Sequence, residues 1–224
     1  MIKNLLLIPI LLFSIKSFAQ QEFHLKDPGA NSVLLNEGWK YSMHDYANAH
    51  LPDFNDSSWT SIRPAADIHD SMPEDAQQGI GFMRLKLRVD EHLRGKQLAF
   101  IVHQSMASEI YLNGTLIQAY GVVSNNAKEV KAYDPLWKPI PITLSDDSIQ
   151  VIAVRFARQP GIRYTTIFGT TNPIFSIEIL SFSKAIQVYK KELLDFPTLS
   201  LNKSIQKNQL QNIPARYYFG TAGK

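Results

Sequence analysis

The strongest constraint on this chain is the alternation of side-chain types within residues 79–120. Apolar residues at positions 83, 85, 87 and 89 alternate with Arg84, Lys86 and Arg88. A period of two is typical of a strand with one buried face, so we expect the three basic side chains to face water. Residues 98–102 are continuously apolar, which predicts a strand covered on both faces.

A hairpin is predicted where Asn113 and Gly114 separate two β-prone runs. Asn-Gly is the strongest short-range hairpin signal, because both turn positions must tolerate a positive φ. Residues 149–156 and 175–179 are further β-prone runs. Together these segments predict an all-β fold, an antiparallel jelly-roll β-sandwich with a short C-terminal helix and an irregular tail.

Two loops are also predicted to pack against this sandwich. Residues 53–59 combine Asx and Ser turn formers with Phe54 and Trp59, whose large apolar surfaces would anchor the loop by burial. Residues 135–141 contain three prolines, which exclude a central strand and favour an edge segment.

Residues 1–19 have the features of a signal peptide. Lys3 precedes an apolar run at 5–13, and small residues occupy positions 17 and 19 before the expected cleavage site. The apolar run is short for a membrane span, which disfavours the alternative of a retained anchor. We therefore predict export to the periplasm or the cell surface. Because the chain contains 0 cysteines, its core would be stabilised by burial without disulfides.

The periodicity changes at Lys184, where apolar residues recur at helical spacing as far as Phe196. Pro197 is expected to end this helix. The predicted organisation is a signal peptide (1–19), a leader with an edge strand (20–32), the sandwich (33–182), a connector helix (183–196) and a poorly ordered tail (197–224).

Composition excludes some classes of protein. Charged residues make up 19% of the 224 residues and hydrophobic residues 45%, which is an ordinary globular composition. The formal charge is +3, and no Lys/Arg cluster concentrates it. We therefore predict no nucleic-acid partner.

Three motifs occur in an order that resembles the sugar-binding jelly-roll domain of glycoside hydrolase family 2, within the galactose-binding-domain-like superfamily. They are Asp53–Trp59, Gly79–Arg84 and Ser108–Gly114, and Ile152–Arg155 is similar to a late core strand of that domain. The resemblance covers about residues 33–182. The positions that define the motifs are Asp56, Trp59, Gly81, Arg84, Asn113 and Gly114.

The chain also resembles the exported N-terminal domains of bacterial membrane signalling proteins with histidine kinase, cyclase or phosphatase outputs. Residues 67–70, 107–114 and 149–155 carry this likeness. The sequence departs from both families, since it contains no barrel with paired catalytic glutamates, no later membrane span and no output domain. The resemblance therefore implies either a stand-alone product or the input portion of a truncated protein.

Catalytic motifs are absent from the sequence. There is no Gly-x-Ser-x-Gly elbow, no phosphate-binding Gly-Lys-Ser/Thr loop and no His-Glu-x-x-His site. Glycoside hydrolysis needs two carboxylates across one sugar, and neither Glu109 nor Glu178 has a predicted carboxylate partner. Asp67–Asp70 contains three potential metal ligands but lacks a partner motif. We therefore predict no enzymatic activity, no metal and no cofactor.

The predicted ligand-binding residues are Tyr133, Trp137, Arg163 and Tyr164. Aromatic faces and planar polar groups near loops are the side chains that hold sugars. The alternative for Trp137, which lies between prolines, is edge packing on the sandwich. We expect the partner to be a small molecule or a glycan, together with a membrane signalling protein. The first functional hypothesis is a ligand-sensing or interaction domain at the input of a signal-transduction protein; the alternative is a carbohydrate-binding accessory module.

Overall fold

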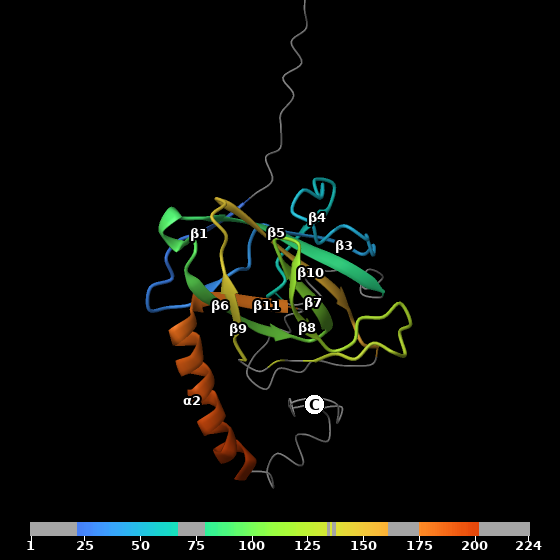
Figure 1. Cartoon of the computed structure of the whole chain (residues 1–224). Coiled ribbons are helices and arrows are strands. Elements are labelled where there is room, and N and C mark those ends of the chain that lie inside the picture. Colours follow the sequence, from blue (N-terminus) through green and yellow to red (C-terminus); the bar gives the residue numbers. More distant parts are fainter. Residues whose placement is uncertain (1–21, 67–78, 134, 136–137, 161–174, 202–224) are drawn as a thin grey trace, which may run out of the picture.

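The computed structural model describes residues 22–66, 79–133, 135, 138–160 and 175–201. Two β-sheets pack face to face, and one helix lies beside the second sheet and extends away from it (Figure 1). The predicted all-β sandwich with a C-terminal helix is confirmed.

The two sheets differ in size. The first sheet has the order β4 (Thr60–Ile62), β3 (Trp39–Ser42), β5 (Ile80–Val89), β10 (Ile149–Ala157), β7 (Ala107–Leu112) and β8 (Thr115–Tyr120), and β1 (Phe23–Leu25) also pairs with β5. The second sheet has the order β2 (Val33–Leu34), β11 (Phe175–Ser181), β6 (Gln97–Gln104) and β9 (Ile140–Thr143). The short 3-10 helix η2 (Glu91–Leu93) joins β5 to β6.

The main core lies between the sheets. The apolar residues at 83, 85, 87 and 89 on β5 are all buried in it, as the alternation predicted. Trp39 of the first sheet meets Phe175 of the second edge to face, with ring centroids 5.9 Å apart. Gly81 also faces this side of the sheet: a Cβ there would lie 2.9 Å from the Phe156 ring, so the close packing requires glycine.

β6 is covered on both faces, as its continuous apolar run predicted. One set of its side chains faces the main core, while Ala99 and Ile101 form a second cluster with Leu180 and Ala185. Ala185 belongs to α2 (Phe182–Leu201), which begins directly after β11. The start of the helix therefore covers part of the outer face of the second sheet.

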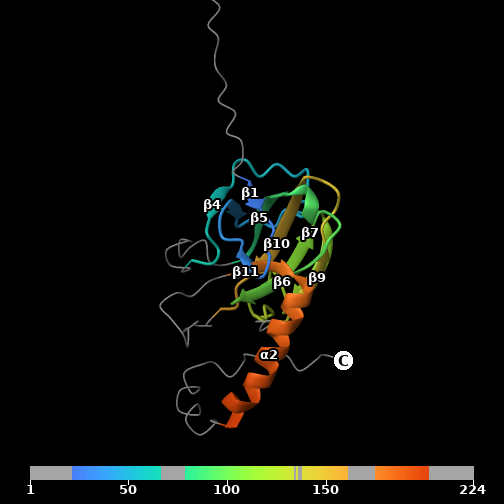
Figure 2. The same ribbon diagram turned by 90° about the vertical axis from the view of Figure 1, so that its left-hand side faces the viewer.

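The predicted end of the connector helix at residue 196 is wrong. α2 runs from Phe182 to Leu201 and contains Pro197 in its interior. Proline removes its own backbone donor and crowds the preceding turn, but residues on either side can keep helical dihedral angles. In Figure 2 the helix points away from the sandwich after its first turns. No helix in the described ranges is both long and apolar enough to cross a bilayer.

The first strand lies inside the predicted leader. β1 pairs in parallel with β5, with Leu25 opposite Val89, and Leu25 is fully buried in the main core. The sandwich thus begins before residue 33. β1 agrees with the edge strand predicted in the leader, but a three-residue strand is too short to show a period, so its burial in the core cannot be derived from residue spacing.

The predicted hairpin is confirmed. Asn113 and Gly114 join β7 to β8 with φ values of +50° and +83°. Asn113 also bonds outside the turn: its Oδ1 accepts from the backbone N–H of Val151 at 2.8 Å. The turn is therefore attached to β10 as well as to its own two strands.

The predicted exposure of the basic residues on β5 is wrong for Arg84. Arg88 is exposed and Lys86 is partly exposed, but Arg84 is fully buried. Residues 43–59, which we call the covering segment, fold over this part of the first sheet. The alternation correctly assigned Arg84 to the outer face, but a local pattern contains no information about a loop that covers that face.

Candidate functional site

The outer face of the first sheet is covered at two places. The covering segment packs Ala49 and Trp59 onto Phe82 of β5, and Phe54 joins this cluster as the predicted aromatic anchor. The second cover lies where β5 and β7 begin and β10 ends: there Val130 packs onto Ile80, Ala107 and Ala157.

Between these two covers, the sheet presents a row of polar side chains. Arg155 of β10 stands opposite Glu109 of β7 in the antiparallel register. Both are outward-facing, since their neighbours at 154 and 110 are in the main core. Arg155 is 22% exposed and Glu109 28% exposed, so solvent reaches both side chains.

Arg155 is held by two carboxylates. Its Nε and Nη2 donate to the two oxygens of Asp45, each at 2.7 Å. Its Nη1 donates to the two oxygens of Glu109 at 3.3 and 3.2 Å. Asp45 comes from the covering segment, so a loop and two strands assemble this group. We call Asp45, Glu109, Tyr111 and Arg155 the Arg155 cluster.

Aromatic rings lie beside these charges. The Tyr111 hydroxyl donates to Oε2 of Glu109 at 3.0 Å. The His50 ring packs against the Tyr111 ring with centroids 5.0 Å apart. The cluster therefore combines a guanidinium, two carboxylates and a partly buried phenol.

The surroundings shift the pKa of three groups in the cluster. The hydrogen bonds from Arg155 hold the pKa of Asp45 below its ordinary value of 3.8, despite partial burial. The same bonds, with those to Glu109, raise the pKa of Arg155. Burial, with the hydrogen bond to Glu109 as the next cause, raises the pKa of Tyr111 to about 12. Two carboxylates and one guanidinium make the cluster formally negative.

This arrangement is suited to recognition. Carboxylate oxygens accept hydrogen bonds and a guanidinium donates them, so neighbouring hydroxyl groups of one ligand could use both. A general acid needs a raised carboxyl pKa, whereas the pKa of Asp45 is lowered. Asp45 is therefore not suited to act as a general acid.

A second arginine on the same face is enclosed. Arg84 Nε donates to Oδ2 of Asp56 at 2.8 Å, and both side chains are buried. Its terminal nitrogens donate to backbone carbonyls of the covering segment, those of Ala49, Leu51, Pro52 and Phe54. Arg84 fixes the covering segment to the sheet and offers no surface to a ligand.

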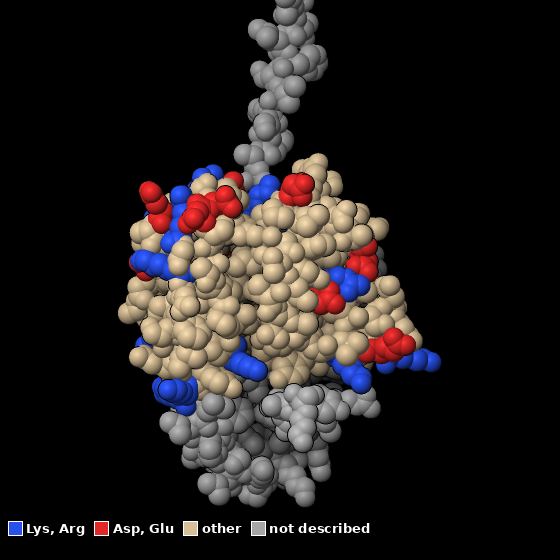
Figure 3. Space-filling view, in the orientation of Figure 1, with Lys and Arg blue, Asp and Glu red and all other residues tan. Residues whose placement is uncertain are grey.

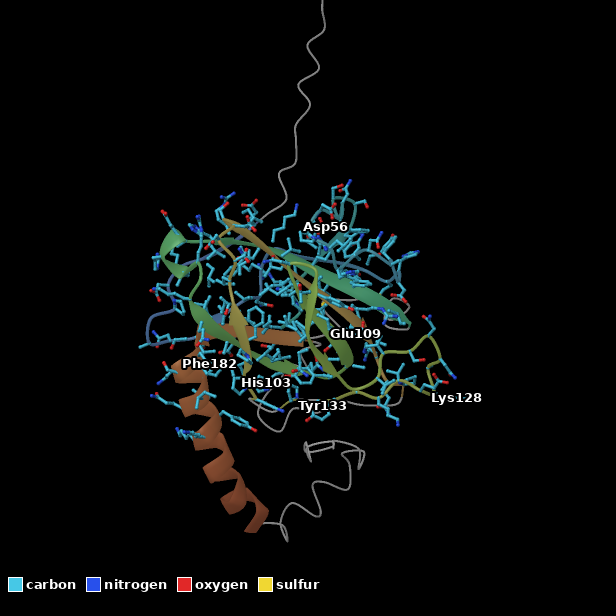
Figure 4. All side chains as sticks on the ribbon, in the orientation of Figure 1. Asp56, His103, Glu109, Lys128, Tyr133 and Phe182 are labelled. Carbon is cyan, nitrogen blue, oxygen red and sulfur yellow. The ribbon has the colours of Figure 1, made fainter. Side chains whose placement is uncertain are left out.

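The motif residues predicted from the family resemblance have structural roles. Asp56 and Arg84 form the buried pair, and Trp59, the last residue of the covering segment, is 8% exposed. Asn113 and Gly114 make the turn, while Gly81 is enclosed. In Figure 4 Asp56 is labelled near the top of the sandwich and Glu109 nearer its middle.

Tyr133 is the one predicted ligand residue that the structure describes. Its ring stacks on Tyr120 with centroids 5.6 Å apart and packs against the main core, on the opposite side of the sheet from Arg155. Its backbone carbonyl accepts from Gln104 at 2.7 Å. In Figure 4 Tyr133 and Glu109 lie at separate places. The structure does not bring Tyr133 into the Arg155 cluster.

The other predicted ligand residues, Trp137, Arg163 and Tyr164, lie outside the described residues, as do Asp67–Asp70. Within the described ranges, no three His, Asp or Glu side chains converge as metal ligands.

The Arg155 cluster itself was not predicted. Arg155 is the one charged residue in the apolar run of β10, which is a usable signal. Glu109 and Arg155 could have been paired as oppositely charged neighbours once the strand register was known. The pairing of Asp45 with Arg155 could not have been predicted, because Asp45 lies 110 residues from Arg155 in sequence and comes from a loop.

The chain has limited similarity to known proteins. No protein-family model matches the sequence. No curated protein matches it either. Among solved structures, a β-glucuronidase of Bacteroides uniformis is 20% identical with a TM-score of 0.45, covering 67% of this chain and 18% of that chain. A glycoside hydrolase family 2 member of Bacteroides cellulosilyticus is 18% identical with a TM-score of 0.46, covering 67% and 21%.

A β-glucuronidase of Faecalibacterium prausnitzii is 11% identical with a TM-score of 0.42, covering 67% of this chain and 31% of the enzyme. The chain thus spans well under two thirds of each of these enzymes.

Proposed function

We propose that this chain is an exported recognition domain that binds a neutral, polyhydroxylated ligand, such as a glycan, at the Arg155 cluster. The observation that carries the proposal is the partly exposed side chain of Arg155, whose guanidinium is held between two carboxylates and beside Tyr111. Sugar hydroxyl groups both donate and accept hydrogen bonds, and this cluster provides both functions within one small area.

The charge of the cluster narrows the ligand class. Asp45 and Glu109 outnumber Arg155, so an anionic ligand would meet a net negative site. A neutral ligand avoids that repulsion. The ring of Tyr111 adds an apolar surface for the face of a sugar ring.

The proposed role is binding without catalysis. Arg155 bonds both carboxylates of the cluster, and the pKa of Asp45 is lowered instead of raised. Glycoside hydrolysis would require one carboxyl group to hold a proton at working pH.

We propose further that binding serves the input side of a signalling system. The support is the direct passage from β11 into α2: β11 pairs with β6 inside the second sheet, and the helix continues outward from it. A rigid helix leaving a ligand-binding domain can transmit a small displacement to a membrane partner. The alternative role is a carbohydrate-binding accessory module, in which α2 would not respond to the ligand. Export rests on residues 1–19.

The binding proposal is tested by glycan-array screening followed by calorimetry with neutral oligosaccharides and a uronic acid. We expect saturable binding of a neutral sugar and little binding of the uronic acid. Arg155→Met should weaken binding about ten- to hundredfold, because a hydrogen bond to a charged group contributes about 1.5–3 kcal/mol.

The matched control is Arg88→Met. Arg88 lies on the same sheet and bonds Glu22 at 2.7 Å, but it is not part of the cluster. Binding should be unchanged in this variant. Preference for the uronic acid, or equal binding by Arg155→Met and the parent chain, would contradict the proposed site.

Hydrogen exchange separates the two roles. If the chain is a signalling input, a bound sugar should change amide exchange at the start of α2, around residues 182–190. If it is an accessory module, protection should change around the Arg155 cluster alone.

A further inference from the structure

The edge strands of the two sheets differ in how well they are protected against pairing with another chain. On one side the first sheet ends in β4 and β1, each three residues long. The second sheet ends in β2, of two residues, and in β9, which contains Pro141. Short strands and prolines are common devices against edge-to-edge pairing. β8, the remaining edge, has six residues, no proline and no charge.

β8 is accessible in the described structure. Leu116 is 50% exposed, and Thr115 and Ala119 are also exposed. Within the described residues β8 pairs with β7 alone, so the backbone groups on its other edge have no strand partner. A β-bulge between β7 and β8 shifts their register near Tyr111 but adds no charge or proline to the free edge.

The lack of charge extends beyond the strand. Residues 115–127 contain no Lys, Arg, Asp or Glu. β8 and β9 lie toward the viewer in Figure 1, and in Figure 3 the middle of this face carries few charged side chains, which gather near its margins. Glu109, the one charged residue on the adjacent strand β7, is paired with Arg155.

We propose that β8 pairs antiparallel with β8 of a second copy of this chain, which joins the two first sheets across a two-fold axis. Such an interface places the same strand against itself, so any charged side chain on β8 would approach its own copy. A neutral strand avoids this repulsion, and the exposed Leu116 would be covered by the outward side chains of the partner strand. Self-pairing therefore fits the charge of this edge better than pairing with a charged peptide.

The dimer would also align the ligand sites. Tyr111 pairs with Leu116, and Glu109 pairs with Ala119, in the β7–β8 register. The Arg155 clusters of the two copies would therefore lie on one continuous sheet face, close to the two-fold axis. The interface itself does not depend on the proposed ligand.

Sedimentation velocity over a range of concentrations of the full chain tests the proposal. We expect a dimer for the parent chain and a shift of at least tenfold toward monomer for Leu116→Lys and for Ala119→Lys. The control is Thr143→Lys, which puts the same charge on an exposed position of the β9 edge and should leave the dimer intact. A monomeric parent chain at about 100 μM, the range of a weak dimer, would overturn the proposal.

Cross-linking provides a second test that does not depend on destabilising the strand. The chain has 0 cysteines, so Ala119→Cys and Thr143→Cys each introduce one unique thiol. A bifunctional maleimide that spans a few residues of the paired strands should produce a covalent dimer from Ala119→Cys, and Thr143→Cys should remain monomeric on a denaturing gel. Equal cross-linking of the two variants, or a dimer that persists in Leu116→Lys, would assign the contact to another surface.

Discussion

Arg84 and Arg155 have similar local settings and different roles. They lie on adjacent strands, β5 and β10, and each bonds an aspartate from the covering segment, at 2.8 and 2.7 Å. Arg84 is fully buried, whereas the side chain of Arg155 is 22% exposed. Arg84 fastens the covering segment to the sheet. Arg155 lies outside the region that this segment encloses.

The difference follows from what surrounds each guanidinium. Backbone carbonyls of the covering segment complete the hydrogen bonding of Arg84 and exclude water. Around Arg155 the remaining acceptor is the partly exposed Glu109. An arginine enclosed by carbonyls stabilises a loop, while one shared between exposed carboxylates remains accessible to a ligand. The following predictions test this contrast.

The largest effect is expected for Arg84→Met. It leaves the carboxylate of Asp56 buried without its partner, and breaking a buried ion pair in this way costs about 3–5 kcal/mol. Urea denaturation should show this loss in the free energy of unfolding. A loss below about 1 kcal/mol, the range of surface pairs, would mean that the two arginines are equivalent.

Arg155→Met should have a much smaller effect on stability. Both of its acidic partners are partly exposed, so water can hydrate them after the substitution. We expect a loss of about 1 kcal/mol or less in the same urea experiment. A loss as large as that of Arg84→Met would show that the Arg155 cluster is structural.

Acid titration should reveal the smaller contribution of Asp45. Its pKa in the folded chain lies below the ordinary value of 3.8, so its pairing stabilises the fold above that pH. The stability difference between the parent chain and Asp45→Asn should shrink as the pH falls through the lowered pKa. A difference that is constant from neutral to acid pH would exclude an ionised pair with Arg155.

The smallest expected effect is on the ionisation of Tyr111, which is measured by absorbance. Tyr111 should ionise at a pH of about 12, identified by subtracting the tyrosinate absorbance of Tyr111→Phe. Because this pKa is raised, the associated stability is complete below pH 10 and is lost as the pH rises toward 12. Glu109→Gln should lower the pKa of Tyr111 in part, since burial is the larger cause. No change in Glu109→Gln would contradict the hydrogen bond between them.

The candidate site was harder to predict than the strands. Aromatic and planar side chains near loops predict a sugar site at residues 133, 137, 163 and 164; Tyr133 stacks on Tyr120, and the other three residues lie outside the described ranges. The Arg155 cluster depends on cross-strand register and on a loop that returns over the sheet. Neither of these can be derived from the spacing of residues along one strand.

The sequence by itself determined the sandwich, because the period of β5 and the turn at Asn113 are local properties that depend on near neighbours. It also determined which side of the sheet Arg84 occupies. Only the tertiary structure decided that this side is covered over Arg84 and accessible at Arg155. Burial depends on contacts between residues far apart in the chain, and a pattern with a period of two contains no information about those contacts.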